Sequence, residues 1–181
     1  MRITPTILLA SAVLLGCDDT PSPLGPDAAA SSTAGPATAA ANGGAHWTVP
    51  ASLFGFEIGN KLQFNARKRA DGQVSGTIDY HQAFLGNAIH LVADVTCMAV
   101  YDGGTRVKYG GPVRVSNDPD IVPGEVFIWF QGIDNGQGAS SPPDQSTIAG
   151  AGDDAANEAF CASSAEPRFA FDVTGNIDVS G

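Results

Sequence analysis

The residues of this chain whose types and spacing could do chemistry are Asp79, His81, His90 and Asp94. They lie in segments where polar and apolar residues alternate, so we expect their side chains on the polar faces of two successive strands. If these strands pair, the four side chains converge near one end of a sheet. Two imidazoles and a carboxylate can bind zinc or perform acid–base catalysis. A solvated face with ordinary cross-strand polar pairs is the other interpretation, and the sequence has no HExxH or related metal-binding spacing.

The segment DNGQGASSPPD, residues 134–144, is a second candidate site. Its carboxylate and carbonyl oxygens lie close together in the sequence, as they do in calcium-binding loops. The candidate ligands are Asp134, Asn135 and Asp144. The segment lacks the acidic residues that an EF-hand carries at its third and fifth positions. Its Asp-Asn-Gly start suits a turn with positive φ and its two prolines stiffen the exit, so a purely structural turn is the other interpretation.

Other motifs of catalysis and cofactor binding do not occur in the sequence. It has no Gly-x-Ser-x-Gly nucleophile motif, no P-loop and no GxGxxG. We therefore expect no cofactor and favour a non-catalytic binding or structural module. The alternatives are a small hydrolase or isomerase that uses Asp79, His81 or His90, and a module for calcium-dependent adhesion. The formal net charge of −10 argues against nucleic acid as a partner.

The N-terminal residues resemble the signal peptide of a bacterial lipoprotein. After Arg2, an apolar run at residues 7–15 is too short for the ~20 residues that span a bilayer, but it has the length of a signal-peptide core. The run leads into LLGC, residues 14–17, which resembles the lipobox of these proteins. The resemblance implies that residues 1–16 are removed and that Cys17 is lipidated. We therefore expect a lipid-anchored, extracytoplasmic protein of the bacterial cell envelope, with a plain signal peptide and an incidental cysteine as the alternative.

Composition divides the remaining chain into a linker and one domain. Residues 17–44 are rich in Pro, Ala, Gly and Ser and hold one large apolar side chain, Leu24, so we predict a disordered linker. Residues 45–181 have the size of a single domain. The expected partners are the membrane, reached through the lipid, and an unidentified envelope or extracellular molecule.

Two further cysteines, Cys97 and Cys161, lie in this domain. Export would place them in an oxidising compartment, where such a pair usually forms a disulfide. Neither cysteine is next to a histidine or part of a Cys-x-x-Cys motif, which argues against a catalytic thiol. We therefore predict a Cys97–Cys161 disulfide, with two free buried thiols as the alternative.

Alternation of polar and apolar residues with a period of two predicts an all-β fold. Residues 62–66, 74–81 and 88–99 alternate in this way, and an Asp-Gly pair marks a hairpin turn. Short turns join the predicted strands, which favours an antiparallel meander over a doubly wound parallel sheet. Pairing residues 176–180 with residues 61–68 would close the meander into a small up-and-down barrel. A two-sheet β-sandwich is the alternative.

Two segments depart from simple alternation. The Gly110-Gly111 pair interrupts a predicted strand and indicates a bulge or bend. Residues 153–161 begin with acidic residues and contain good helix formers, so we predict a short helix there. The side chains predicted to fill the interior are bulky enough to argue against a large pocket. They are Leu62, Phe64, Val74, Ile78, Tyr80, Ile89, Leu91, Val95, Val107, Val113, Val115, Ile128 and Phe130.

Several motifs together resemble a family of small secreted bacterial domains with no assigned activity. They are FxA and DGxVSG within residues 64–76, VTC at residues 95–97, the DNGQGASSPPD loop, and FC at residues 160–161 followed by GNI at residues 175–177. The loop is the most specific of these motifs. The resemblance implies an extracytoplasmic β-domain in which two cysteines recur at these places. It implies no reaction, substrate or catalytic residue.

Overall fold

The computed structural model describes residues 36–138 and 140–181. The predicted signal peptide, Cys17 and linker residues 18–35 lie outside the described residues. Within the two described ranges, none of the helices has the length and apolar character needed to cross a membrane.

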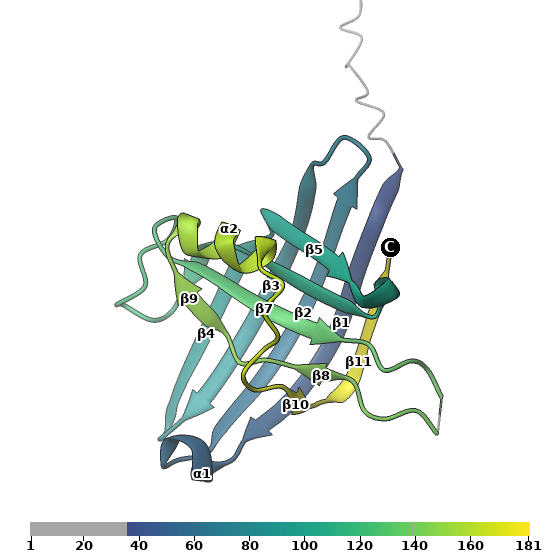
Figure 1. The fold of residues 1–181 in the computed structure, drawn as a ribbon. Helices are drawn as coiled ribbons and strands as arrows, with labels where there is room; N and C mark the ends of the chain where they lie inside the picture. The colour runs from purple at the N-terminus through teal and green to yellow at the C-terminus, as the bar shows by residue number, and fades with distance from the viewer. Residues whose placement is uncertain (1–35, 139) are drawn as a thin grey trace, which may run out of the picture. The chain divides into compact units, whose positions relative to one another are not determined.

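Strands make up most of the secondary structure of the described residues (Figure 1). In chain order they are β1 (Ala37–Val49), β2 (Ile58–Arg69), β3 (Val74–Phe84), β4 (Asn87–Asp94), β5 (Cys97–Tyr101), β6 (Arg106–Ser116), β7 (Phe127–Ile133), β8 (Gln145–Ser146), β9 (Gly150–Gly152), β10 (Phe171–Asp172) and β11 (Thr174–Ser180). The helical elements are α1 (Ala51–Phe54), the 3-10 turn η1 (Asp102–Gly104) and α2 (Asp154–Ala162).

The strands form an antiparallel sheet that curls into a nearly closed barrel (Figure 1). Neighbouring strands follow the order β10-β8-β7-β6-β4-β3-β2-β1-β11, while β5 pairs with β6 and β9 pairs with β7. Short turns join many of these neighbours. In the β2–β3 hairpin, Gly72 has a φ of 85°, the left-handed conformation that the predicted Asp-Gly turn requires. The prediction of an all-β antiparallel barrel is confirmed.

The predicted last strand forms, but it pairs with a different strand from the one predicted. β11 pairs with β1, with Val179 opposite Ala41, and not with residues 61–68. β1 begins at Ala37 and so includes residues 37–44, which were predicted as linker. Because β1 also pairs with β2 along its length, it lies between two other strands of the sheet.

Small side chains allow this N-terminal segment to fit between its two neighbouring strands. Ala41 and Ala45 are buried in the core, and Gly43 lies between them on the same face. A Cβ added at Gly43 would lie 2.8 Å from the Phe64 ring and 2.7 Å from the carbonyl oxygen of Asn176. The segment lacks large apolar side chains because those of its neighbouring strands occupy the space.

Side-chain carboxylates close the seam between β11 and β7, where the described residues form no backbone ladder. The two strands are close, since a Cβ added at Gly132 would lie 3.3 Å from Ile177 Cγ2. Asp144 Oδ2 accepts a hydrogen bond from the Ile177 backbone N–H at 2.7 Å. Asp134 Oδ2 accepts one from the Val179 backbone N–H at 3.1 Å. The loop that follows β7 therefore holds the last strand in place.

Inward-facing side chains fill the core of the barrel. The rings of Phe64 and Tyr109 stack with centroids 4.3 Å apart, and Tyr80 meets Phe130 edge-on at 5.0 Å. Burial of a large apolar side chain stabilises a fold by about 1.5–3 kcal/mol. All the predicted interior residues are buried or partly buried except Val115, which is 46% exposed.

A β-bulge explains the wrong prediction for Val115. Val92 of β4 pairs with Val115, and the next residue, Ala93, pairs with Val113. Arg114 is therefore an extra residue on β6, and a bulge of this kind shifts the alternation of the strand. As a result Val113 points into the core and Val115 points to solvent.

The predicted strand at residues 88–99 is in fact two strands, because the chain changes partners. β4 pairs with β3 and ends at Asp94, whereas β5 pairs with the first part of β6. The Gly110-Gly111 pair lies where β6 passes from β5 and β7 to β4. A Cβ added at Gly111 would lie 1.9 Å from the Asp94 carbonyl oxygen, so this crossing requires glycine.

Helix α2 packs against β5, β6 and β7 on the outside of the barrel (Figure 1). It confirms the helix predicted at residues 153–161, and its N-cap Asp153 accepts a hydrogen bond from the Ala156 backbone N–H at 2.8 Å. The predicted disulfide is also confirmed. It joins Cys97 of β5 to Cys161 of α2 and fixes the helix to the sheet.

Candidate functional site

All three histidines of the chain lie in one row across the outer face of the sheet. In the register of β1 to β4, His46 is opposite Lys61, Lys61 is opposite His81, and His81 is opposite His90. These residues alternate along their strands with more deeply buried ones, so their side chains point away from the core. Strand pairing thus gathers on one face imidazoles that are far apart in the sequence.

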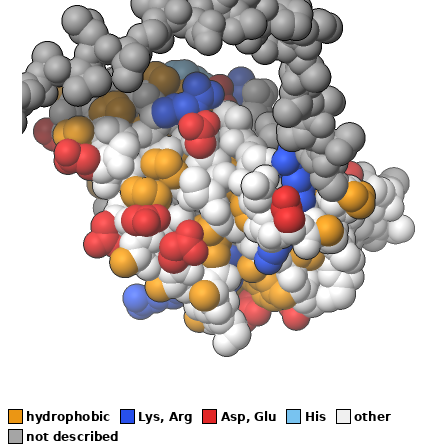
Figure 2. Space-filling view, turned by 90° about the horizontal axis from the view of Figure 1, so that it is seen from above, with side chains coloured by type: hydrophobic (Ala, Val, Ile, Leu, Met, Phe, Trp, Pro, Cys, Tyr) orange, Lys and Arg blue, Asp and Glu red, His pale blue; other side chains and the backbone are white. Residues whose placement is uncertain are grey.

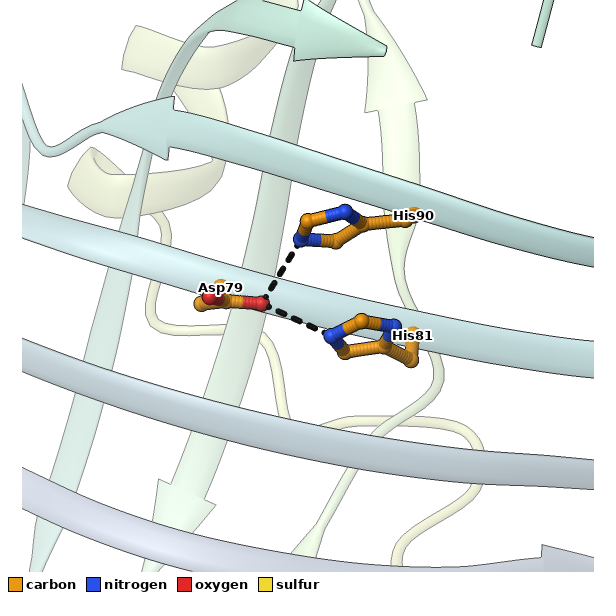
Figure 3. Close-up of side chains that lie close together, drawn as sticks. All are labelled: Asp79, His81 and His90. Carbon is orange, nitrogen blue, oxygen red and sulfur yellow. Dashed lines mark hydrogen bonds and ion pairs between the residues drawn. The ribbon is translucent and has the colours of Figure 1, made fainter. Parts of the chain in front are cut away.

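Asp79 joins two of these histidines in a compact group that we name the Asp–His–His cluster: Asp79, His81 and His90 (Figure 3). Asp79 Oδ1 lies 3.1 Å from His81 Nε2 and 3.0 Å from His90 Nε2. The two imidazole rings are stacked, with centroids 4.0 Å apart and planes inclined by 3°. One potential ligand atom from each residue lies within 4.8 Å of the other two.

The β3–β4 hairpin sets the geometry of the cluster. Its turn at residues 85–86 has positive φ at both positions and places His81 directly opposite His90. Asp79 is two residues before His81 on β3 and therefore lies on the same face. On the other side of β4, Asn117 Oδ1 accepts a hydrogen bond from the His90 backbone N–H at 2.7 Å. The cluster is thus built on paired strands and not on a free loop.

Asp94 lies apart from the cluster. It is four residues beyond His90 on the same strand, a distance of about 13 Å along β4. Its Oδ1 pairs with Arg114 Nε at 3.0 Å. The predicted convergence is therefore correct for Asp79, His81 and His90 and wrong for Asp94.

A shallow hollow of about 630 Å³ lies on the outer face beside the histidine row. Its floor is the adjacent cross-strand row of small residues: Thr48, Gly59, Ala83 and Ala88. The histidine row, Lys61 and Asn117 also line it. We name it the outer-face hollow, and the Asp–His–His cluster lies at its edge because two of the cluster's residues belong to the lining.

The loop at residues 134–144 uses its carboxylates for backbone hydrogen bonds. Asp144 Oδ1 accepts from the Asn135 N–H at 2.9 Å, and Asp134 Oδ1 accepts from the Gly136 N–H at 2.8 Å. The other oxygen of each carboxylate accepts from β11. Gly136 has a φ of 88°, which the predicted turn requires. These contacts favour the structural interpretation of the loop over a calcium site.

A buried polar network lies beneath the outer-face hollow, and the alternation pattern did not reveal it. The Tyr80 hydroxyl donates to Asn60 Oδ1 at 2.6 Å and accepts from Gln82 Nε2 at 2.9 Å. Burial raises the pKa of Tyr80 above its ordinary value, so this hydroxyl stays protonated and can donate. The network satisfies polar groups in the core and helps to fix β2 and β3 below the cluster.

Lys108 is a second residue whose burial the alternation pattern missed. It is 1% exposed, and its ammonium donates to the backbone oxygens of Ser163 and Ala165 and to Ser163 Oγ, just beyond the C-terminus of α2. Burial lowers the pKa of Lys108. The neighbouring segment at residues 125–132, EVFIWFQG, is apolar on both faces. This pattern indicates, from the sequence alone, that the sheet is covered on its outer face at this place. Lys108 has a structural role at the end of the helix.

Comparison with known proteins gives no match: no family model, no curated protein and no solved structure is similar to this chain. The chemistry of the Asp–His–His cluster follows from its own residues. Two imidazole nitrogens and a carboxylate oxygen on a rigid sheet can bind a cation, accept a hydrogen bond from a ligand or transfer a proton.

Proposed function

We propose that the protein is a lipid-anchored, extracytoplasmic lipoprotein whose β-barrel is a non-catalytic binding module. Cys17 carries the anchor, and the outer-face hollow is the binding surface. The observation that carries the proposal is the contrast between the two faces of the sheet. Buried side chains fill the core, whereas every histidine of the chain lies on one open outer face.

The exposure of the Asp–His–His cluster favours binding over catalysis. Its side chains keep between 37% and 48% of their surface exposed. General acid–base groups and catalytic dipoles work best in concave sites from which water is excluded. A hydrolase or isomerase that uses Asp79, His81 or His90 would have to work without such an enclosure.

Two features of the domain support the extracytoplasmic location and the lipid anchor. A disulfide between Cys97 and Cys161 suits an oxidising compartment outside the cytoplasm. Acidic side chains are spread over the face of the molecule in Figure 2, among basic and apolar ones. With a net charge of −10, electrostatic attraction would not hold the domain on an anionic membrane, whereas two or three acyl chains on Cys17 would.

Metabolic labelling with an alkyne fatty acid tests the anchor. The full chain is expressed in a bacterial host, and label on the purified protein is measured for the parent, Cys17→Ser and the matched control Cys97→Ser. We expect label on the parent and on Cys97→Ser and none on Cys17→Ser, with the labelled protein in the membrane fraction. An unlabelled parent, or equal label on Cys17→Ser, would refute the lipoprotein assignment.

A further inference from the structure

The donor atoms of the Asp–His–His cluster already have the spacing of a metal site. A tetrahedral ion with bonds of about 2.0–2.1 Å separates neighbouring ligand atoms by about 3.3 Å. The two imidazole nitrogens lie 3.0 and 3.1 Å from the Asp79 oxygen, and all three atoms are within 4.8 Å of one another. Small side-chain rotations would therefore bring the three donors to bonding distance of one ion.

The strands hold these donors in place without the help of an ion. His81 and His90 form a directly opposed cross-strand pair, and Asp79 projects from the same face two residues earlier. Both Nε2 atoms point toward the same carboxylate oxygen (Figure 3). Little conformational entropy remains to be lost on binding, which favours affinity.

The donor types select the class of ion. Imidazole nitrogens suit zinc, copper and nickel, whereas calcium and magnesium prefer six or more oxygen ligands. Without an ion, these contacts are exposed polar contacts, and exposed contacts of this kind contribute only about 0–1 kcal/mol to stability.

We propose that Asp79, His81 and His90 bind a divalent transition-metal ion of the zinc, copper or nickel class. The three residues leave at least one coordination position, which is free for water or for a donor atom of a ligand. The metal site adds a class of ligand to the proposed binding function. It rests on that proposed function only for the choice of the outer face as the binding surface. Metal binding does not depend on the lipid, so the two proposals fail independently.

Zinc titration of the full-length chain carrying Cys17→Ser tests the site. This substitution removes the one cysteine outside the disulfide, so no free thiol competes for zinc. Imidazole nitrogen–proton NMR spectra are well suited because the chain has only three histidines. We expect zinc to shift the signals of His81 and His90 at a one-to-one stoichiometry and to leave His46 unchanged.

Calorimetry on variants supplies the second measurement. Loss of a residue that merely supports a ligand costs about 10–100-fold in metal affinity, so His81→Ala, His90→Ala and Asp79→Asn should each weaken zinc binding by about tenfold or more. Asp94→Asn, four residues beyond His90 on β4 and outside the cluster, is the matched control and should bind zinc as the parent does. His81→Gln, with its folding checked by thermal unfolding, guards against a loss caused by misfolding.

Several results would overturn the site. Zinc binding that survives His81→Ala together with His90→Ala, or that is lost equally in Asp94→Asn, would place the metal elsewhere. Equal affinity for calcium and zinc would contradict the donor set. No binding of zinc, copper or nickel by the parent would remove the proposal, whatever the fatty-acid labelling of Cys17 shows.

Discussion

Replacement of Asp144 by alanine should weaken the seam of the barrel, and the structure sets the size of the effect. Asp144 is 6% exposed, and its two oxygens accept from the backbone N–H groups of Ile177 and Asn135. A buried donor left without its charged partner costs about 1.5–3 kcal/mol. Ile177 would lose this amount in full, whereas water can replace the partner of the less buried Asn135 N–H. We expect a loss of about 3 kcal/mol in the free energy of unfolding.

Urea unfolding followed by tryptophan fluorescence measures this loss. Asp134→Ala is the matched control, because Asp134 makes the equivalent contact to Val179 from a less buried position. It should cost no more than about 1 kcal/mol. Hydrogen exchange adds a local measurement, since the Ile177 amide should lose protection in the Asp144 variant. A loss below about 1 kcal/mol with Ile177 still protected would show that the carboxylate does not hold the seam.

Four further outcomes follow from the same structure. Adding calcium should leave the Tm unchanged, because the carboxylates of the 134–144 loop already accept backbone hydrogen bonds. Alanine in place of both disulfide cysteines should cost about 4 kcal/mol of unfolding free energy in a denaturant titration, since the bridge closes a loop with a sequence separation of 64. Gly111→Ala should lower the free energy of unfolding by about 2–3 kcal/mol, because the new Cβ would collide with the Asp94 carbonyl oxygen. Gly44→Ala is the control and should be near neutral, since a Cβ there meets nothing within 4 Å. Burial is the largest cause of the raised pKa of all three tyrosines, which reaches about 12 for Tyr101. The contribution of these tyrosines to stability is therefore complete below pH 10, the ordinary pKa of tyrosine. It is lost as the pH rises through the raised pKa values. An alkaline titration of tyrosinate absorbance should therefore show little ionisation near pH 10, and ionisation there without unfolding would contradict the burial.

Alternation along single strands was sufficient to predict much of this fold. The positions of Leu62, Ile78 and Tyr80 follow from a period of two, because each strand has one face in the core. The same rule put Asp79, His81 and His90 on outer faces, and the short β3–β4 turn then brought them together. Local pattern and local connection are both visible in a sequence, so this part could be predicted.

The errors arise where the structure depends on a partner strand. The bulge that turns Val115 outward is a property of the β4–β6 pair and leaves no mark on β6 alone. Residues 37–44 were assigned to a linker because they lack large side chains, although they need none between Phe64 and Ile177. The prediction groups Asp94 with the histidines because the register of the paired strands is not visible in the sequence.

The pairing of β1 with β11 has a consequence for the order in which the barrel can assemble. Ala40 and Ser180 are partners although almost the entire domain separates them in sequence, and contacts of such high contact order form late. While β1 is paired only with β2, its other edge stays exposed until β11 joins the sheet. The alanines and glycines of this strand give it low β-propensity and little apolar surface, which makes the waiting edge a poor template for aggregation. The composition that resembles a linker is thus suited to a strand that must remain unpaired on one side until β11 joins the sheet.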